Sequence, residues 1–203
     1  MARKYEQRLR AEAAEETRRR ILDAVYARLR EAPGEPVSID RIATLARVAR
    51  PTVYLVFGSR SGLFDAVGAD LLQRGGFERV LQVSADPDGR EALRGTIRAV
   101  VEMYAVHGDV LRVLSAMALL DAAAVGGAIR RLEDGRAAGM ARLAHRLAEQ
   151  GVLRPDVTAD RAADVLWLLT SFDGFDLLHT GRQRPVDEVV TALITTAERS
   201  LLR

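Results

Sequence analysis

The chain has 203 residues, of which 48% are hydrophobic, so it is long and apolar enough to bury a substantial core and is not a disordered chain. It contains no cysteine, which excludes disulfides, thiolate metal sites and cysteine nucleophiles. No apolar run approaches the roughly 20 residues of a membrane span, and the charged N-terminus lacks the apolar core of a signal peptide, so we expect a cytoplasmic protein.

The charge is unevenly distributed along the chain. Residues 1–60 carry 13 Lys and Arg against 8 Asp and Glu, a net charge of +5, whereas residues 61–203 carry 17 against 20, a net charge of −3. A basic segment beside a mildly acidic body is typical of a polyanion-binding module joined to a second part with another role. An ordinary solvated surface is the alternative explanation. We expect two domains, a DNA-binding domain at 1–60 and a helical ligand-binding and dimerisation domain at 61–203.

Helical periodicity starts near the N-terminus. Apolar positions recur at helical spacing from about residue 8 to residue 31, which predicts an amphipathic first helix that Pro33 and Gly34 end. Ser38 is a good N-cap for a short second helix. After a break at 47–49, Pro51 suits the first turn of a third helix because its φ is already close to the helical value.

The remainder of the chain also reads as helices. A fourth helix follows Ser59 or Ser61 and is interrupted at Gly75-Gly76, a fifth closes at His107-Gly108, and a short apolar one follows over 109–120. A long helix ends at Gly151, and two strongly apolar helices follow at 158–180 and 185–201, opened by Thr158 and Pro185. Since no alternating run of useful length is present, the predicted fold class is all-α.

Two short helices separated by a short break match a helix-turn-helix, in which the N-terminal end of the second helix enters the major groove of DNA. The hydroxyls of Thr52 and Tyr54 can donate to phosphate oxygens, Arg50 can reach a guanine edge, and Leu55 can meet a thymine methyl. Arg60 is placed to hold a further phosphate. The alternative is that Tyr54 packs in the core and the arginines are only solvated. The expected DNA-binding set is Ser38, Thr44, Arg47, Arg50, Pro51, Thr52, Tyr54, Leu55 and Arg60.

The stretches "TRRRILDAVYARL" and "SIDRIATLARVARPTVYLVFGSRSGLF" resemble the first helix, the helix-turn-helix and the start of the fourth helix of the TetR family of transcriptional regulators. This resemblance covers residues 17–67, and beyond them only the length and the helical character fit. It implies a homodimer that binds a near-palindromic operator, usually as a repressor, and leaves it when a small molecule enters the C-terminal domain. It also implies a four-helix dimer interface, here made by residues 158–180 and 185–201.

Three positions depart from the family pattern. Arg47 replaces the common turn glycine, so a positive φ at this position carries a steric penalty. Ala49 replaces the usual small polar residue before the recognition helix and removes a side-chain cap that contributes about 1 kcal/mol. Val56 replaces a histidine that often contacts phosphate in the family.

The C-terminal part has no comparable signature. Its three histidines lie on different segments without a metal-binding spacing, and no nucleotide-binding loop, nucleophile elbow or carboxylate pair is present, so we expect no metal, no cofactor and no enzymatic activity. Semi-polar residues on the apolar helices are those that a mostly apolar ligand pocket uses, although each also fits a core position. The candidate ligand-binding residues are Tyr104, His107, Met117, Met140, Trp167, Thr170, Ser171 and Phe175.

The sequence therefore predicts a ligand-responsive, DNA-binding transcriptional regulator, a homodimeric repressor released from its operator by an apolar or amphipathic small molecule. The competing hypothesis is a helical ligand-binding or catalytic protein in which the helix-turn-helix serves only packing. Gly75-Gly76 allows two interpretations, a simple helix end or a hinge that transmits ligand binding to the recognition helices.

Overall fold

The computed structural model describes residues 2–203, with side chains from residue 5 onward. Over this range the chain is helical, and its β pairing is limited to an isolated bridge between Leu153 and Leu202. The predicted all-α fold class is confirmed. The chain forms two compact units: the first comprises the residues up to Asp70 with Asp109–Ile129, and the second comprises Leu71–Gly108 with Arg130–Arg203. The expected domain boundary at residue 60 stays a prediction.

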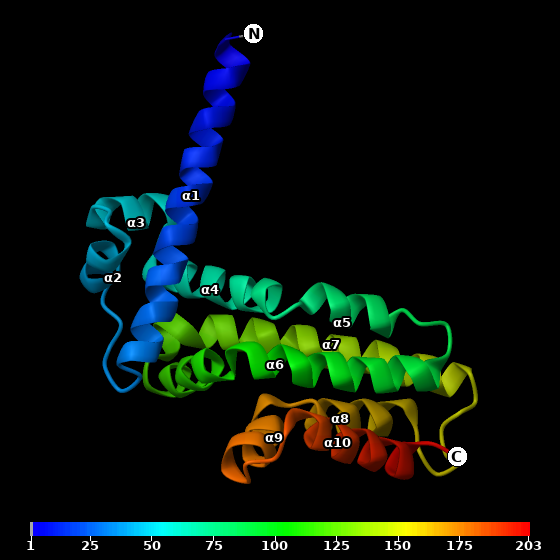
Figure 1. Cartoon of the computed structure of the whole chain (residues 1–203). Coiled ribbons are helices and arrows are strands. Elements are labelled where there is room, and N and C mark those ends of the chain that lie inside the picture. The colour runs from blue at the N-terminus through cyan, green and yellow to red at the C-terminus, as the bar shows by residue number, and fades with distance from the viewer. Residues whose placement is uncertain (1) are drawn as a thin grey trace. The chain divides into compact units, whose positions relative to one another are not determined.

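The first unit is built on the long helix α1 (Ala2–Glu31), followed by α2 (Ile39–Ala46), α3 (Arg50–Phe57) and the start of α4 (Arg60–Arg74) (Figure 1). The apolar stripe of α1 is buried from Ile21 to Leu29, and the predicted apolar face of α2 is buried as well. Val53 of α3 and Phe64 of α4 complete this core. Burial of these stripes explains why α2 and α3 form, because helices of eight residues are too short to be stable in isolation.

The remaining helices are α5 (Phe77–Ser84), α6 (Gly89–Leu120), α7 (Gly127–Glu149), α8 (Ala159–Leu169), α9 (Phe172–Asp176) and α10 (Val186–Leu201). Single π-helical turns, η1 (Ala122–Gly126) and η2 (Leu177–Gly181), follow α6 and α9. The caps predicted at Thr158 and Pro185 are confirmed, and Gly151 has a φ of +64° just past the end of α7. The interruption predicted at Gly75-Gly76 is also confirmed, since α4 ends at Arg74 and Gly76 has a φ of +84°.

The single helix predicted over 158–180 is wrong. Helix α8 stops at Leu169, the φ and ψ of Thr170 leave helical values, and Ser171 becomes the N-cap of α9 by accepting a 3.1 Å hydrogen bond from the Gly174 N–H. The carbonyl that Thr170 frees at this break accepts a 3.1 Å hydrogen bond from the buried hydroxyl of Tyr104 on α6. A hydrogen bond from a distant helix therefore satisfies the backbone carbonyl that the break leaves without a partner inside its own helix.

Helix α6 differs from the prediction in two ways. Its hydrogen bonding continues past His107, where φ is −137°, so the expected helix end is a kink inside one long helix. By length and composition α6 also meets the criteria of a membrane span, which the sequence analysis did not anticipate. Leu93, Ile97, Val110 and Leu114 are buried at helical spacing along it, and we therefore interpret α6 as a core helix.

Candidate nucleic-acid interface and buried aromatic cluster

The turn between α2 and α3 is fixed by a left-handed residue. Arg47 has φ +54° and ψ +47°, and its N–H donates to the Thr44 carbonyl at 3.1 Å while the Val48 N–H donates to the Ala43 carbonyl at 3.0 Å. These two bonds form a Schellman motif, in which glycine is the usual left-handed residue. The steric penalty expected at Arg47 is therefore present, and its side chain is exposed beside the helix pair.

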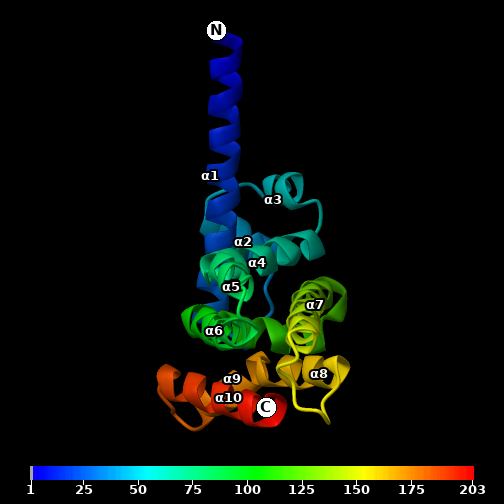
Figure 2. The ribbon, with the colours of Figure 1, turned by 90° about the vertical axis from the view of Figure 1, so that its right-hand side faces the viewer.

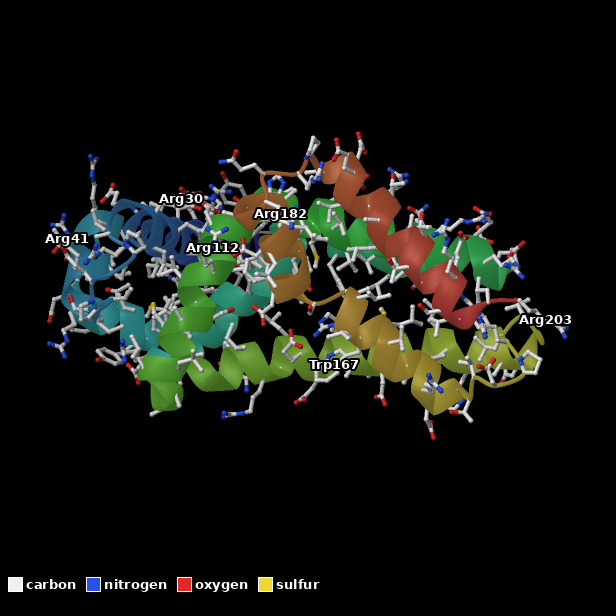
Figure 3. All side chains as sticks on the ribbon, turned by 90° about the horizontal axis from the view of Figure 1, so that it is seen from below. Arg30, Arg41, Arg112, Trp167, Arg182 and Arg203 are labelled. Atoms are coloured by element: carbon white, nitrogen blue, oxygen red, sulfur yellow. The ribbon has the colours of Figure 1, made fainter. Side chains whose placement is uncertain are left out.

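Ser38 and Thr44, both assigned to the DNA-binding set from the sequence, are exposed and make local bonds on α2. The Ser38 hydroxyl caps the helix by accepting from the Arg41 N–H at 3.2 Å, and the Thr44 hydroxyl donates to the Asp40 carbonyl at 2.9 Å. Arg41 lies at the outer edge of this helix (Figure 3). Both hydroxyl oxygens keep a free lone pair or can rotate, so these bonds are compatible with further polar contacts.

Helix α3 is anchored on one side and open on the other. Val53 is fully buried, whereas Leu55 is 86% exposed and Tyr54 is 38% exposed. Pro51 occupies the first turn, as predicted; Ala49 makes no side-chain cap, and the Thr52 N–H donates to the Ala49 carbonyl at 2.9 Å. Tyr54 and Leu55 are thus accessible for the DNA contacts expected of them, which stay predictions, whereas Thr52 is half-buried.

Arg50 is held at the N-terminal end of α3 by two neighbours. Its guanidinium pairs with the Asp40 carboxylate of α2 at 3.2 Å and lies 5.8 Å from the centroid of the Tyr54 ring. Both members of the ion pair are more than half exposed. An exposed pair of this kind contributes little to stability, so Arg50 is oriented by Asp40 without being tied to it.

Arg60 lies in a different environment from the one that the sequence suggested. Its guanidinium binds the Asp121 carboxylate, donates to the Val37 carbonyl at 3.3 Å, and lies 5.5 Å from the centroid of the Phe64 ring. The hydrogen bond from Arg60 lowers the pKa of Asp121, whose carboxylate also accepts from the Ala124 N–H. This partly exposed ion pair joins the start of α4 to Asp121, the N-cap of η1, and the phosphate contact of Arg60 stays a prediction.

In the second unit, three aromatic rings from α6 and α9 pack together. Tyr104 lies edge-on to Phe172 with ring centroids 5.5 Å apart, and Phe175 lies 5.8 Å from Tyr104 and 5.0 Å from His179, on which it stacks. Burial raises the pKa of Tyr104, so its hydroxyl stays protonated and remains a donor. Tyr104 and Phe175 were expected at a ligand site, whereas Phe172 and His179 were not.

Arg136 of α7 is the charged residue beside these rings, and the sequence reasoning missed it as a functional candidate. Its side chain is 10% exposed, binds Glu133, and donates to the Trp167 carbonyl and, at 3.2 Å, to the Thr170 hydroxyl. The guanidinium also lies 5.3 Å from the Trp167 ring (Figure 3 labels Trp167). The signal was visible in the sequence, because Arg136 interrupts the apolar stripe of α7 between Leu132 and Met140.

The other predicted ligand residues are dispersed. His107 lies half-buried at the kink of α6, Met140 is buried on α7, and Ser171 is occupied as the cap of α9. Met117 belongs to the first unit. Among residues 2–203, no group of three or more His, Asp or Glu side chains is arranged to hold a metal ion. The second unit thus links four of the predicted residues: Arg136 contacts Trp167 and Thr170, and Tyr104 contacts both Thr170 and Phe175.

Known proteins share parts of this sequence and its fold. No family model matches the sequence. The chain is 31% identical over 100 residues to an HTH-type transcriptional repressor of Streptomyces coelicolor, and the match spans 49% of this chain and 48% of that protein, about half of each.

Solved structures resemble the chain over most of its length. A TetR-family transcriptional regulator described as putative, from Syntrophomonas wolfei, superposes with a TM-score of 0.73 at 17% identity, covering 91% of this chain and 94% of that one. A transcriptional regulator, also described as putative, from Saccharomonospora viridis, solved in complex with choline, gives a TM-score of 0.67 at 21% identity, covering 93% and 99%.

A helix-turn-helix joined to an all-helical body is the architecture that this chain shares with those solved structures. The chain has the fold of TetR-family regulators.

Proposed function

We propose that this protein is a cytoplasmic, homodimeric repressor that occupies a near-palindromic DNA operator through α3 and is released from it by a small molecule. The observation that carries this proposal is the division of α3 into a buried anchor, Val53, and an open face that presents Tyr54 and Leu55 next to Arg50. This open face offers three kinds of contact to a duplex: the guanidinium of Arg50, the hydroxyl of Tyr54 and the apolar side chain of Leu55.

The contacts follow from the chemistry of each group. Arg50 reads a guanine edge in the major groove, and Leu55 meets a thymine methyl. The hydroxyls of Thr52 and Tyr54 near the start of α3 hold phosphates. Arg47, exposed at the turn, adds positive charge toward the backbone of the duplex. In a dimer the two α3 helices meet successive major grooves about 34–36 Å apart, which makes the operator near-palindromic.

The effector is an apolar or amphipathic molecule bound in the second unit. Tyr104, Phe172 and Phe175 supply aromatic surface, and Arg136 with Thr170 supplies polar groups that orient a ligand. The choline complex of the Saccharomonospora viridis regulator supports a small molecule as the effector of a protein with this fold. The packing of the three rings against one another implies that a ligand has to displace at least one of them.

Salt-dependent binding to duplex DNA tests the proposal. Wild-type protein should bind a duplex selected from a random library, with log K falling linearly as log salt concentration rises, because each neutralised phosphate releases counterions. The buried-anchor variant Val53→Ala tests fold integrity, and Leu55→Ala tests the open face with little effect on unfolding. A wild-type protein that is folded yet binds no duplex at low salt contradicts the proposed function and favours a helix-turn-helix used only for packing.

A further inference from the structure

The first half of α1 projects away from the rest of the first unit. The described side chains from Tyr5 to Glu16 are exposed, and contact with the core begins at Thr17 and Arg18. Fifteen residues, 2–16, therefore form an arm of about 22 Å at 1.5 Å per residue. Figures 1 and 2 show from two directions that this arm continues past α3 on the side of the unit where α3 lies.

The arm is a stiff continuation of a packed helix. Helix nucleation is costly and propagation is cheap, and the buried half of α1 already supplies the nucleus. Residues 2–16 contain neither glycine nor proline, and the Arg8 and Glu12 side chains form an i,i+4 ion pair at 3.2 Å. At its base, the Arg18 guanidinium lies 4.9 Å from the centroid of the Phe57 ring at the end of α3, which fixes the arm relative to the recognition helix.

Charge is segregated along the arm. The first ten residues carry four basic groups, Arg3, Lys4, Arg8 and Arg10, against one acidic group, Glu6. Residues 11–16 carry three glutamates and no basic group, and three arginines follow at 18–20. The tip is thus positive, and it is separated from the positive helix-turn-helix by an acidic band.

The amino-acid composition of the arm indicates which kind of partner it binds. Tyr5 and Leu9 are its only large apolar side chains, which is too little apolar surface for a membrane-bound or coiled-coil helix, both of which need a sustained stripe. A basic tip complements a polyanion, and the polyanion that α3 positions beside the arm is the operator duplex.

We infer that the arm, residues 2–16, is a second DNA-binding element whose basic tip contacts the sugar–phosphate backbone flanking each half-site. This inference rests on the proposed function of α3. Since the major groove is about 8.5 Å deep, an arm of about 22 Å that passes α3 runs beyond the groove floor and along the side of the duplex. The acidic band keeps the middle of the arm off the phosphates, so binding to the backbone is confined to the tip.

The test neutralises the tip while keeping the helix. For a dimer of the variant Arg3→Gln/Lys4→Gln/Arg8→Gln/Arg10→Gln, the slope of log K against log salt should be smaller by at least about 2, because each of the two arms neutralises at least one phosphate and each lost phosphate reduces the slope by about 0.9. Hydroxyl-radical footprinting should show no protection at the two outer flanks and full protection at the centre. A matched control, Arg79→Gln/Arg130→Gln/Arg142→Gln/Arg182→Gln, changes the net charge equally on exposed arginines outside the helix-turn-helix.

The outcomes separate the two proposals. A tip variant with the slope and footprint of the wild type overturns the arm inference and leaves the function of α3 standing. Equal reductions of the slope in the tip variant and the control also overturn it, because they report net charge alone. A changed oligomeric state of a chain lacking residues 2–16, measured by sedimentation, assigns the arm to self-association instead. A wild type that binds no duplex refutes the proposed function itself.

Discussion

At the scale of single residues, the arginines around the helix-turn-helix differ in what holds them. Arg50 forms one exposed ion pair with Asp40, which contributes little to stability and is easily exchanged for a base edge. Arg60 is more enclosed and has three partners, Asp121, Val37 and Phe64, so removing its guanidinium from them costs more. Because the pKa of Asp121 is lowered by this pair, the stabilisation that it provides is present at neutral pH and is lost as acid protonates the carboxylate.

Arg50→Ala should reduce selectivity. We expect a loss of about 1–3 kcal/mol on the selected duplex and a much smaller loss on random DNA, because a bidentate contact to guanine carries sequence information. Fluorescence anisotropy on both duplexes measures the difference. Asp40→Asn is the control, since it removes the ion pair and keeps the arginine, and it should retain selectivity. Equal losses on the two duplexes for Arg50→Ala remove Arg50 from base reading.

Arg47→Gly should stabilise the fold. A non-glycine residue in the left-handed region costs about 1–2 kcal/mol, and glycine returns part of this as unfolded-state entropy, so a net gain of roughly 0.5–1 kcal/mol is expected in urea unfolding. Arg47→Lys keeps both the charge and the strain and should leave the stability unchanged. If Arg47→Gly is no more stable than the wild type, the left-handed turn carries no penalty. The DNA affinity of Arg47→Gly, compared with that of Arg47→Lys, measures the phosphate contact that is proposed for the Arg47 side chain.

At the scale of helices, the sequence predicted a helix boundary correctly where a residue at the boundary itself determines it. Ser38, Thr158 and Pro185 were predicted as helix starts because capping and proline chemistry act within one turn. The break at Thr170 was not predictable in this way, because the apolar spacing continues through Phe172 and Phe175, and the carbonyl at the break is satisfied by Tyr104, which lies 66 positions away in the sequence. The aromatic cluster could be predicted only in part for the same reason.

Gly76→Ala should destabilise the junction between α4 and α5. Gly76 has a φ of +84°, so alanine there costs about 1–2 kcal/mol in urea unfolding. Gly76→Asn is the matched control, because asparagine tolerates this region better, and it should lose less. Equal losses for Ala and Asn show that a factor other than φ sets the cost.

The hinge interpretation needs a variant free of this strain. A Cβ on Gly75 would lie 2.6 Å from Cγ of Met103, so the double substitution Gly75→Ala/Gly76→Ala mixes a steric clash with backbone strain. Gly76→Asn alone keeps the turn and restricts its motion, since asparagine has fewer accessible conformations than glycine. If this variant keeps its operator affinity but requires a different ligand concentration for release, the junction acts as a hinge, whereas unchanged release assigns it to a simple helix end.

At the scale of the whole molecule, dimer formation depends on which apolar side chains remain exposed after the chain folds. The apolar stripe of α10, including Val189, Val190, Leu193 and Ala197, is buried within the second unit itself. Helix α8 leaves Trp167 and Leu168 at 43% and 69% exposure. Residues 158–180 and 185–201 therefore stay the proposed dimer interface, with its apolar centre on the open face of α8.

Leu168→Glu should give a folded monomer. Sedimentation at micromolar concentration should show the loss of the dimer, with unchanged circular dichroism, because a charge at an exposed position costs little in the monomer and is costly in a buried interface. Leu81→Glu, on an exposed leucine of α5, is the matched control and should remain dimeric. Leu193→Glu or Ala197→Glu should instead unfold the chain, since both side chains are buried in its own core. DNA affinity should fall with the dimer, because a monomer engages a single half-site. A Leu168→Glu protein that remains dimeric moves the interface away from α8.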